Sequence, residues 1–335
     1  MNSSQALELH RKSLVVDLHA DTAVLLRFGY DVGERHDPPL PGGALGVHLD
    51  LPRMREGGLD VQFFGLPSAP KKLPFGWGGP KRTVDRLLDA LEAAASQYSD
   101  DFELVLNAAE MQSAYDRGKI VGLRGIEGAH ALEGDLDNVA HFAQRGVAYL
   151  GLLHFTSNDA GAPAYGRGRD DNLGLTPFGR ELIDELNRLN VMVDLAHINR
   201  KGFMEAAERS TAPVIVSHTG VCGAHQHWRN IDDEQIRVVA ESGGCIGVIF
   251  SRRYLGDSTL DGVCAHLQHV MNVGGEDLPA LGSDFDGFVV PPQGLSDVRG
   301  LPDLTQTMSR WGFTEGQIKK MLGENAIRVL TDVRG

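Results

Sequence analysis

The chain has 335 residues and a formal net charge of −13, with hydrophobic side chains at 42% and charged side chains at 23% of its length. This composition supports a large apolar core and excludes a disordered chain. The acidic balance, without a run of Lys and Arg, argues against nucleic acid or an anionic membrane surface as a partner. No stretch approaches the roughly 20 apolar residues of a membrane helix, and no signal-peptide core follows Met1. We therefore predict a cytoplasmic protein that acts on small molecules, with no nucleic-acid or membrane partner.

Eight short apolar runs alternate with amphipathic segments along the chain, which is the pattern of a (β/α)₈ barrel. The predicted strands cover residues 14–19, 59–66, 120–127, 147–154, 191–197, 213–218, 245–250 and 278–284. The clearest helix has Thr176 as its N-cap and Pro177 at its first position, and it stops at Asn190. Further helices are predicted over 84–98, 232–241 and 314–330.

The length of the chain exceeds the requirement of such a barrel. A (β/α)₈ barrel takes about 250 residues, so the remainder forms loop insertions and an N-terminal segment. Gly- and Pro-rich composition places the insertions at 65–81, 158–173 and 285–302. We predict one (β/α)₈ TIM barrel domain of the metal-dependent hydrolase type over residues 1–335.

The three cysteines do not indicate a disulfide framework. Cys222, Cys245 and Cys264 are odd in number and have no CxxC spacing, so we predict three free thiols and no zinc ribbon. Cys222 is the one candidate nucleophile, but nothing in the sequence places a base beside it.

Polar side chains stand at the ends of six predicted strands. In a parallel barrel these ends converge on the face that carries the active site. The residues are Asp17, His19, Asp21, Glu127, His154, His197, His218 and Asp284. A single His or Asp after a strand is usually a hydrogen-bonded loop residue, but burying this many together without a cation would be costly. We therefore predict a metal site, with ligands that suit zinc and also manganese, cobalt or iron.

Several common catalytic signatures are missing from the sequence. It contains no HExxH, no GxxxxGK[ST] and no GxGxxG after a strand, and no lysine ends a predicted strand. The usual metalloprotease, P-loop, dinucleotide-binding and Schiff-base chemistries are therefore not indicated.

A set of ordered motifs, spread from about residue 15 to 330, resembles the membrane (renal) dipeptidase family of the amidohydrolase superfamily. Each motif alone is weak, but their order and spacing are specific. They are His19-Ala20-Asp21, the segment 125–130 (GIEGAH), Leu153-His154, 193–197 (VDLAH), 213–218 (PVIVSH), Arg229-Asn230 and 281–287 (LGSDFDG).

This resemblance implies a zinc-dependent dipeptidase, with substrates that include dipeptides with a D-residue on the C-terminal side. By similarity, two Zn²⁺ ions, for which Co²⁺ or Mn²⁺ could substitute, share a hydroxide. His19 and Asp21 would hold one ion and His197 and His218 the other, with Glu127 bridging them.

The same resemblance assigns the substrate-binding residues. His154 would contact the scissile carbonyl, Arg229 the terminal carboxylate of the dipeptide, and Asp284 would transfer protons. The family also suggests a homodimer. Because no hydrophobic tail precedes Gly335, we expect no lipid anchor.

Two other functions fit the same residues. An amidohydrolase that acts on N-acyl amino acids or lactones could use the same binuclear site, and assays against free dipeptides would separate the two. A non-catalytic metal-binding protein would keep the ligands. It would have no need of His154, Arg229 or Asp284, which argues against that alternative.

Overall fold

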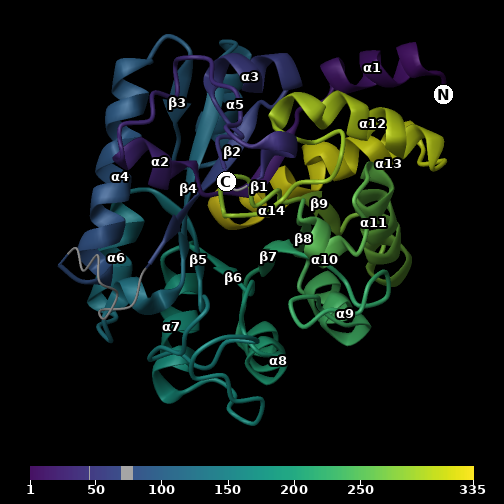
Figure 1. The fold of residues 1–335 in the computed structure, drawn as a ribbon. Coiled ribbons are helices and arrows are strands. Elements are labelled where there is room, and N and C mark those ends of the chain that lie inside the picture. The colour runs from purple at the N-terminus through teal and green to yellow at the C-terminus, as the bar shows by residue number, and fades with distance from the viewer. Residues whose placement is uncertain (45, 69–77) are drawn as a thin grey trace.

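The computed structural model describes residues 1–44, 46–68 and 78–335, and its strands form one parallel sheet (Figure 1). Eight strands close into a barrel, because β2 pairs along its whole length with β4 while the order continues from β4 through β9 and β1 back to β2. The strands are β1 (Val16–Ala20), β2 (Val61–Pro67), β3 (Phe102–Leu104), β4 (Ile120–Glu127), β5 (Val147–Gly151), β6 (Met192–Asp194), β7 (Ile215–Thr219), β8 (Cys245–Val248) and β9 (Pro279–Leu281). The predicted (β/α)₈ barrel is confirmed.

Helices surround this barrel, as Figure 1 shows. They are α1 (Ser3–Lys12), α2 (Thr22–Arg27), α3 (Leu51–Gly57), α4 (Pro80–Gln97), α5 (Ala108–Asp116), α6 (Asp137–Gln144), α7 (Pro177–Arg188), α8 (Arg200–Arg209), α9 (Asp233–Glu241), α10 (Arg252–Leu255), α11 (Leu260–Gly274), α12 (Leu301–Arg310), α13 (Glu315–Lys319) and α14 (Asn325–Arg334). A π-helical turn, Lys320–Glu324, joins α13 to α14. Short 3₁₀ turns lie at Pro41–Gly43, Ala129–Leu132 and Val298–Gly300. None of the described helices is long and apolar enough to cross a membrane.

The predicted helices are present with small changes at their ends. The Thr176 side chain accepts a hydrogen bond from the Gly179 amide and caps α7, as its sequence predicts. The helix predicted over 314–330 continues to Arg334 through the π-helical turn. Of the predicted insertions, 158–173 contains no helix, and part of 65–81 (residues 69–77) lies outside the described residues.

Four strands end earlier than predicted, and one of them is β8, which stops at Val248. β5, β6 and β9 stop at Gly151, Asp194 and Leu281, so the polar residues that follow them lie in loops. His197 and Asp284 adopt positive φ angles of 68° and 60°, which are incompatible with an extended ladder. These residues leave the sheet in order to project their side chains over the end of the barrel.

Strand β3 was not predicted. It has three residues, too few for a recognisable alternation, and it pairs only with the start of β4, where Phe102 lies opposite Ile120. It therefore lies outside the closed ring, on the flank of the barrel.

A buried arginine connects α3 to the segment that follows β9. The Arg53 side chain is 0% exposed, and its Nε donates to Asp50 Oδ2 at 2.6 Å while Nη1 lies 3.2 Å from Asp297 Oδ2. The Asp50 side chain also caps α3. Removing one partner of such a buried ion pair destabilises the protein, because the remaining charges have no counterion.

We expect Arg53→Met to lower the free energy of unfolding by about 3–5 kcal/mol, measured by urea denaturation, because Asp50 and Asp297 would remain buried and uncompensated. The matched control is Arg55→Met on the same helix. Arg55 pairs with Asp101 at the surface, with exposures of 44% and 59%, so its loss should change stability by about 1 kcal/mol or less. Equal losses for both variants would contradict the proposed role of the buried pairs.

Candidate metal centre

Four imidazoles converge on one carboxylate at the C-terminal end of the barrel. Glu127 Oε1 lies 2.9 Å from Nε2 of His197, 3.5 Å from that of His154, 3.6 Å from that of His218 and 4.0 Å from that of His19. Glu127 is the last residue of β4, and the histidines come from β1, β7 and the loops after β5 and β6. Residues distant in sequence therefore meet because the ends of parallel strands meet.

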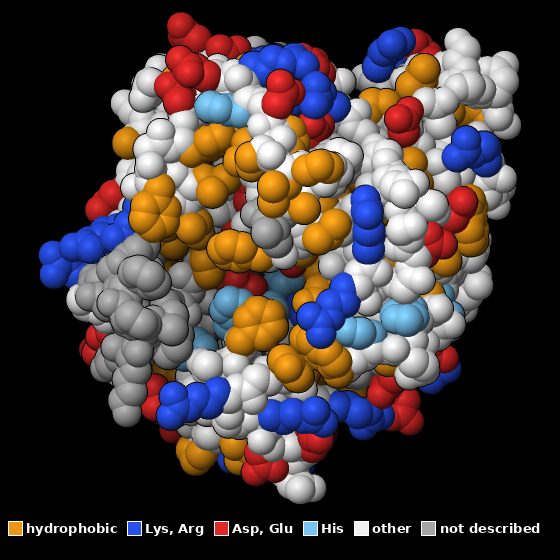
Figure 2. All heavy atoms as spheres, viewed as in Figure 1, with side chains coloured by type: hydrophobic (Ala, Val, Ile, Leu, Met, Phe, Trp, Pro, Cys, Tyr) orange, Lys and Arg blue, Asp and Glu red, His pale blue; other side chains and the backbone are white. Residues whose placement is uncertain are grey.

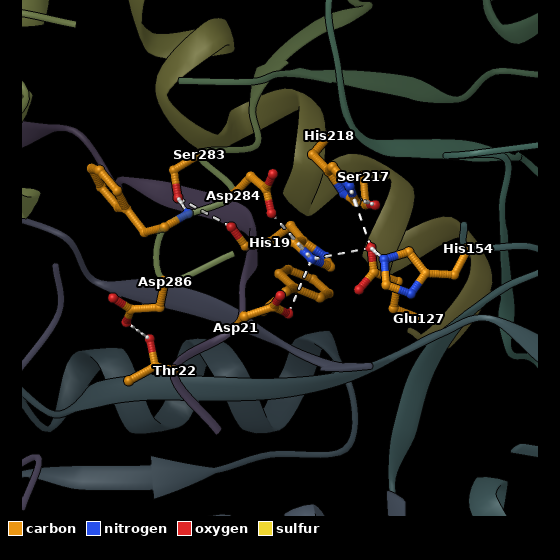
Figure 3. Close-up of polar contacts among 12 residues, drawn as sticks. His19, Asp21, Thr22, Glu127, His154, Ser217, His218, Ser283, Asp284 and Asp286 are labelled. Carbon is orange, nitrogen blue, oxygen red and sulfur yellow. Dashed lines mark hydrogen bonds and ion pairs between the residues drawn. The ribbon is translucent and has the colours of Figure 1, made fainter. Parts of the chain in front are cut away.

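Two further carboxylates lie on the other side of His19. Its Nε2 is 3.5 Å from Asp21 Oδ1 and 3.9 Å from Asp284 Oδ1. Figure 3 shows Asp21, His19 and Asp284 on one side of Glu127 and His154 on the other, and the His218 ring centroid lies 4.0 Å from that of His19. The structure thus brings together all seven residues predicted at the metal site and its proton-transfer position.

The site contains buried polar atoms that no protein group satisfies. His19 Nε2, Asp21 Oδ1 and Glu127 Oε2 are buried and have no hydrogen-bond partner among the described residues. Because buried polar atoms are almost always paired, their convergence fits a bound cation. The nitrogen and oxygen donors, without a thiolate, suit zinc and neighbouring divalent metals.

Three groups of side chains have the spacing needed for a metal ion. Glu127 occurs in two of them, and His19 occurs in two. The groups are His19, Glu127 and His218; Glu127, His154 and His197; and His19, Asp21 and Asp284. The geometry therefore favours Glu127 as a shared ligand, and it also brings His154 and Asp284 within reach of a cation.

The electrostatics of the site favour neutral imidazoles on one side and negative charge on the other. Burial lowers the pKa of His197 and of His218 well below the ordinary value, so each keeps a lone pair for a metal. Burial also acts to lower the pKa of His19, but Asp21, Glu127 and Asp284 outweigh it and raise this pKa to about 10. The carboxylates around His19 therefore create a strong preference for positive charge.

His218 is oriented by a serine and an aspartate that were not predicted as functional. Ser217 Oγ donates to Asp194 Oδ2 at 2.7 Å and lies 2.9 Å from His218 Nδ1. Because the hydroxyl has one hydrogen, already given to Asp194, it accepts from Nδ1–H, and the lone pair of His218 is left on Nε2. The sequence could have indicated a role for Ser217, because this residue directly precedes His218.

His19 has an analogous support. Its Nδ1 lies 2.7 Å from the hydroxyl of Tyr149 in β5, which the sequence analysis missed. A Cβ at Gly125 would lie 1.9 Å from the Tyr149 ring, so only glycine leaves space for the tyrosine to reach His19. Asp17 lies on β1, the strand that carries His19. It accepts from the Ser283 amide and hydroxyl at 2.7 and 2.6 Å, which fixes the backbone next to Asp284.

Arg229 is buried beside the cluster without a counterion. Its side chain is 5% exposed, and it donates to the His218 carbonyl at 2.7 Å and to Thr219 Oγ1 at 3.3 Å. No carboxylate of the described residues lies within ion-pair distance of it. A buried guanidinium without a counterion has the charge and the paired donors that a carboxylate ligand requires.

The site opens to solvent through a hollow. Figure 2 shows histidine side chains at the floor of this hollow, with acidic side chains among them and hydrophobic side chains around them. Phe155 is 41% exposed, and its ring lies 4.6 Å from that of His154 and 4.9 Å from that of His197. An apolar side chain at the opening reduces the access of water to the cluster.

Comparison with known proteins gives a consistent family. A sequence profile of the membrane dipeptidase family (peptidase family M19) matches residues 3–335. A solved metallopeptidase from Rhodobacter sphaeroides, liganded with a phosphinate mimic of the dipeptide L-Ala-D-Ala, is 30% identical with a TM-score of 0.82, over 96% of this chain and 100% of that chain. A metallopeptidase of family M19 described as dipeptidase AC is 32% identical with a TM-score of 0.81, over 96% and 99% of the two chains. An amidohydrolase from Pseudomonas aeruginosa is 30% identical with a TM-score of 0.81, over 100% of both chains. These similarities confirm the resemblance indicated by the motifs.

We expect Ser217→Ala to weaken metal binding by roughly 10- to 100-fold, because His218 Nδ1 loses its acceptor and Asp194 loses its hydroxyl donor. The measurement is competition for zinc against a calibrated chelator. The control is Ser113→Ala, an exposed serine of α5 that accepts only from Arg117. Unchanged affinity in the Ser217 variant would show that this hydrogen bond does not orient His218.

Proposed function

Because the chain belongs to the membrane dipeptidase family and is a metal-dependent dipeptidase, we propose that it uses two zinc ions at the Glu127 cluster and holds the substrate carboxylate with Arg229. The observation that carries this proposal is the convergence of unsatisfied ligand atoms beside an arginine without a counterion. His19 and Asp21 would hold one ion, His197 and His218 the other, and Glu127 both.

Divalent ions held there would polarise the scissile carbonyl and lower the pKa of the attacking water. The remaining chemistry belongs to side chains of the protein. Asp284 lies within 3.9 Å of His19 Nε2 and is not required to complete either ligand set, so it can accept a proton from the attacking water and give it to the leaving amine. His154, on the opposite side of Glu127, can donate to the oxygen of the scissile carbonyl as negative charge develops there.

The position of Arg229 would set the distance between the scissile bond and the C-terminal carboxylate of the substrate. The guanidinium binds the main-chain carbonyl of His218, and the imidazole of the same residue faces Glu127. A carboxylate on Arg229 is therefore close enough to the cluster for one residue, and not several, to separate it from the scissile bond. A free dipeptide has this separation.

The substrates would include dipeptides with a D-residue at the C-terminal position. This proposal is supported by the R. sphaeroides relative, whose ligand mimics L-Ala-D-Ala.

We expect a pair of substitutions to distinguish a metal ligand from the proton-transfer residue. Metal analysis of the purified protein should give two divalent ions per chain, and chelation should abolish dipeptide hydrolysis until zinc, cobalt or manganese is added. His197→Ala should lower the metal content. Asp284→Asn should keep both ions while lowering kcat by roughly 100-fold, the scale of a lost acid–base group. Loss of metal from the Asp284 variant would make Asp284 a ligand, and full activity of metal-free protein would overturn the mechanism.

We expect Arg229→Met to lower kcat/KM for a free dipeptide by about 2–4 kcal/mol of lost transition-state stabilisation, because methionine offers no paired donors to the carboxylate. The same substitution should have a much smaller effect on the C-terminal amide of that dipeptide. Steady-state kinetics on both substrates measure the difference. Equal losses on acid and amide would mean that Arg229 supports the loop after β7 and does not bind substrate.

A further inference from the structure

The described residues include three buried arginine side chains, and they differ in how their charge is neutralised. Arg53, Arg124 and Arg229 are 0%, 7% and 5% exposed. Arg53 pairs with two aspartates, and Arg229 lies at the catalytic site. Arg124 has neither a carboxylate within ion-pair distance among the described residues nor a place in the catalytic site.

Arg124 points away from the metal cluster. It precedes Glu127 by three residues on β4, so the two side chains project from opposite faces of the strand. Its Nε has no acceptor among the described residues, and Nη1 reaches only the Val105 carbonyl, at 3.4 Å. The guanidinium packs over Gly146, where a Cβ would lie 2.7 Å from Nη1. The protein therefore makes space for this cation but does not neutralise it.

Arg124 is one of the residues that line an open cavity of about 320 Å³ on the flank of the barrel, between α4 and β3. These two elements lie next to each other in Figure 1. The cavity has an apolar wall of Ala95, Phe102 and Leu104, and the hydroxyls of Ser96 and Ser99 lie at its edge. Its size is at the lower end of the range for small-molecule sites, so it suits a ligand of a few carbon atoms.

The other charged groups of the cavity already have partners. Glu103 lies 2.7 Å from both Arg117 and Lys119, and Glu92 lies 2.7 Å from Arg145. Arg124 is therefore the lining cation that lacks a counterion in the described part of the chain. Burial lowers its pKa, but an arginine remains charged under all ordinary conditions, so an incoming anion would relieve an uncompensated charge.

We propose that this cavity is a second binding site, which takes a small organic carboxylate with an apolar body. The carboxylate would accept from the free N–H groups of the Arg124 guanidinium, and the apolar body would lie against Phe102 and Leu104. A simple carboxylic acid and a free amino acid both present this chemistry. The amino acid also carries an ammonium group, for which Glu92 and Glu103 are the nearby acceptors.

The test is calorimetric titration of isovalerate and of L-leucine into zinc-loaded Arg229→Met protein, so that the catalytic arginine does not contribute. We expect a dissociation constant in the range of about 1 mM, and no binding of the neutral analogue isovaleramide. Tighter binding of isovalerate assigns the site to simple acids, and tighter binding of L-leucine assigns it to amino acids.

Adding Arg124→Leu to this protein should weaken the binding by at least about tenfold, since hydrogen bonds to a charged group are lost. Adding Arg188→Leu, which removes an exposed arginine of α7 and changes net charge equally, should leave the binding unchanged. Ala95→Phe fills the cavity and keeps Arg124, so it should also abolish binding. If circular dichroism shows that the Arg124 variant is unfolded, the Ala95 variant tests whether the ligand binds in this cavity.

Three results would overturn the proposal. They are binding that persists in the Arg124 and Ala95 variants, equal binding of the acid and the amide, and the absence of binding at about 20 mM ligand, twenty times the expected dissociation constant.

Discussion

The convergence of imidazole nitrogens on Glu127 Oε1 is the constraint on which the rest of this structure depends. Nε2 of His197 and Nε2 of His218 lie 2.9 Å apart, although burial holds both rings in the neutral state. Two lone pairs at this distance repel each other unless a proton or a cation lies between or beside them. The surroundings are shaped to permit this arrangement. A Cβ at Gly65 of β2 would lie 2.7 Å from both Asp21 Oδ1 and the His19 ring, so glycine at this position leaves the space that these two side chains occupy.

Two buried aspartates beneath the cluster connect neighbouring strands at junctions where few residues pair. β1 meets β9 at a single residue pair, Asp17 and Leu281, and β6 meets β7 at a single pair, Asp194 and Ile215. At each of these junctions a buried aspartate accepts from the amide and hydroxyl of a serine on the neighbouring segment, Ser283 or Ser217. These side-chain bonds add to backbone bonds between the same segments, such as Asp284 N–H to the His19 carbonyl at 3.0 Å and Leu195 N–H to the Ile215 carbonyl at 2.9 Å. Because each serine directly precedes a site residue, the same bonds position Asp284 and His218.

The sequence identified the side chains that converge at the end of the barrel better than it identified the short strand at its flank. The ends of apolar runs located His19, Glu127 and His218, because the side chains at strand ends are determined by local pattern and by barrel geometry together. Tyr149 could not be found in this way. Its ring lies in the middle of an apolar strand, and its contact with His19 depends on the absence of a side chain at Gly125, which is a tertiary relation. Strand β3 and the unpaired charge of Arg124 were missed for the same reason. Local sequence determines neither the strand with which β3 pairs nor the burial of the Arg124 side chain.

In the proposed function, His218 would link substrate binding to metal binding through one residue. Its imidazole faces Glu127, while its carbonyl accepts from Arg229 Nη2 at 2.7 Å. The spacing between the carboxylate anchor and the ligand cluster is therefore set by the covalent geometry of a single residue of β7 and not by the packing of separate elements. Arg229 is fixed by carbonyl and hydroxyl oxygens, which orient a guanidinium without neutralising it, and so its charge remains available to a ligand. In the proposed function, a substrate carboxylate one residue from the scissile bond would neutralise this buried charge while the bond lies over the cluster, so the arginine would select the last peptide bond of a substrate.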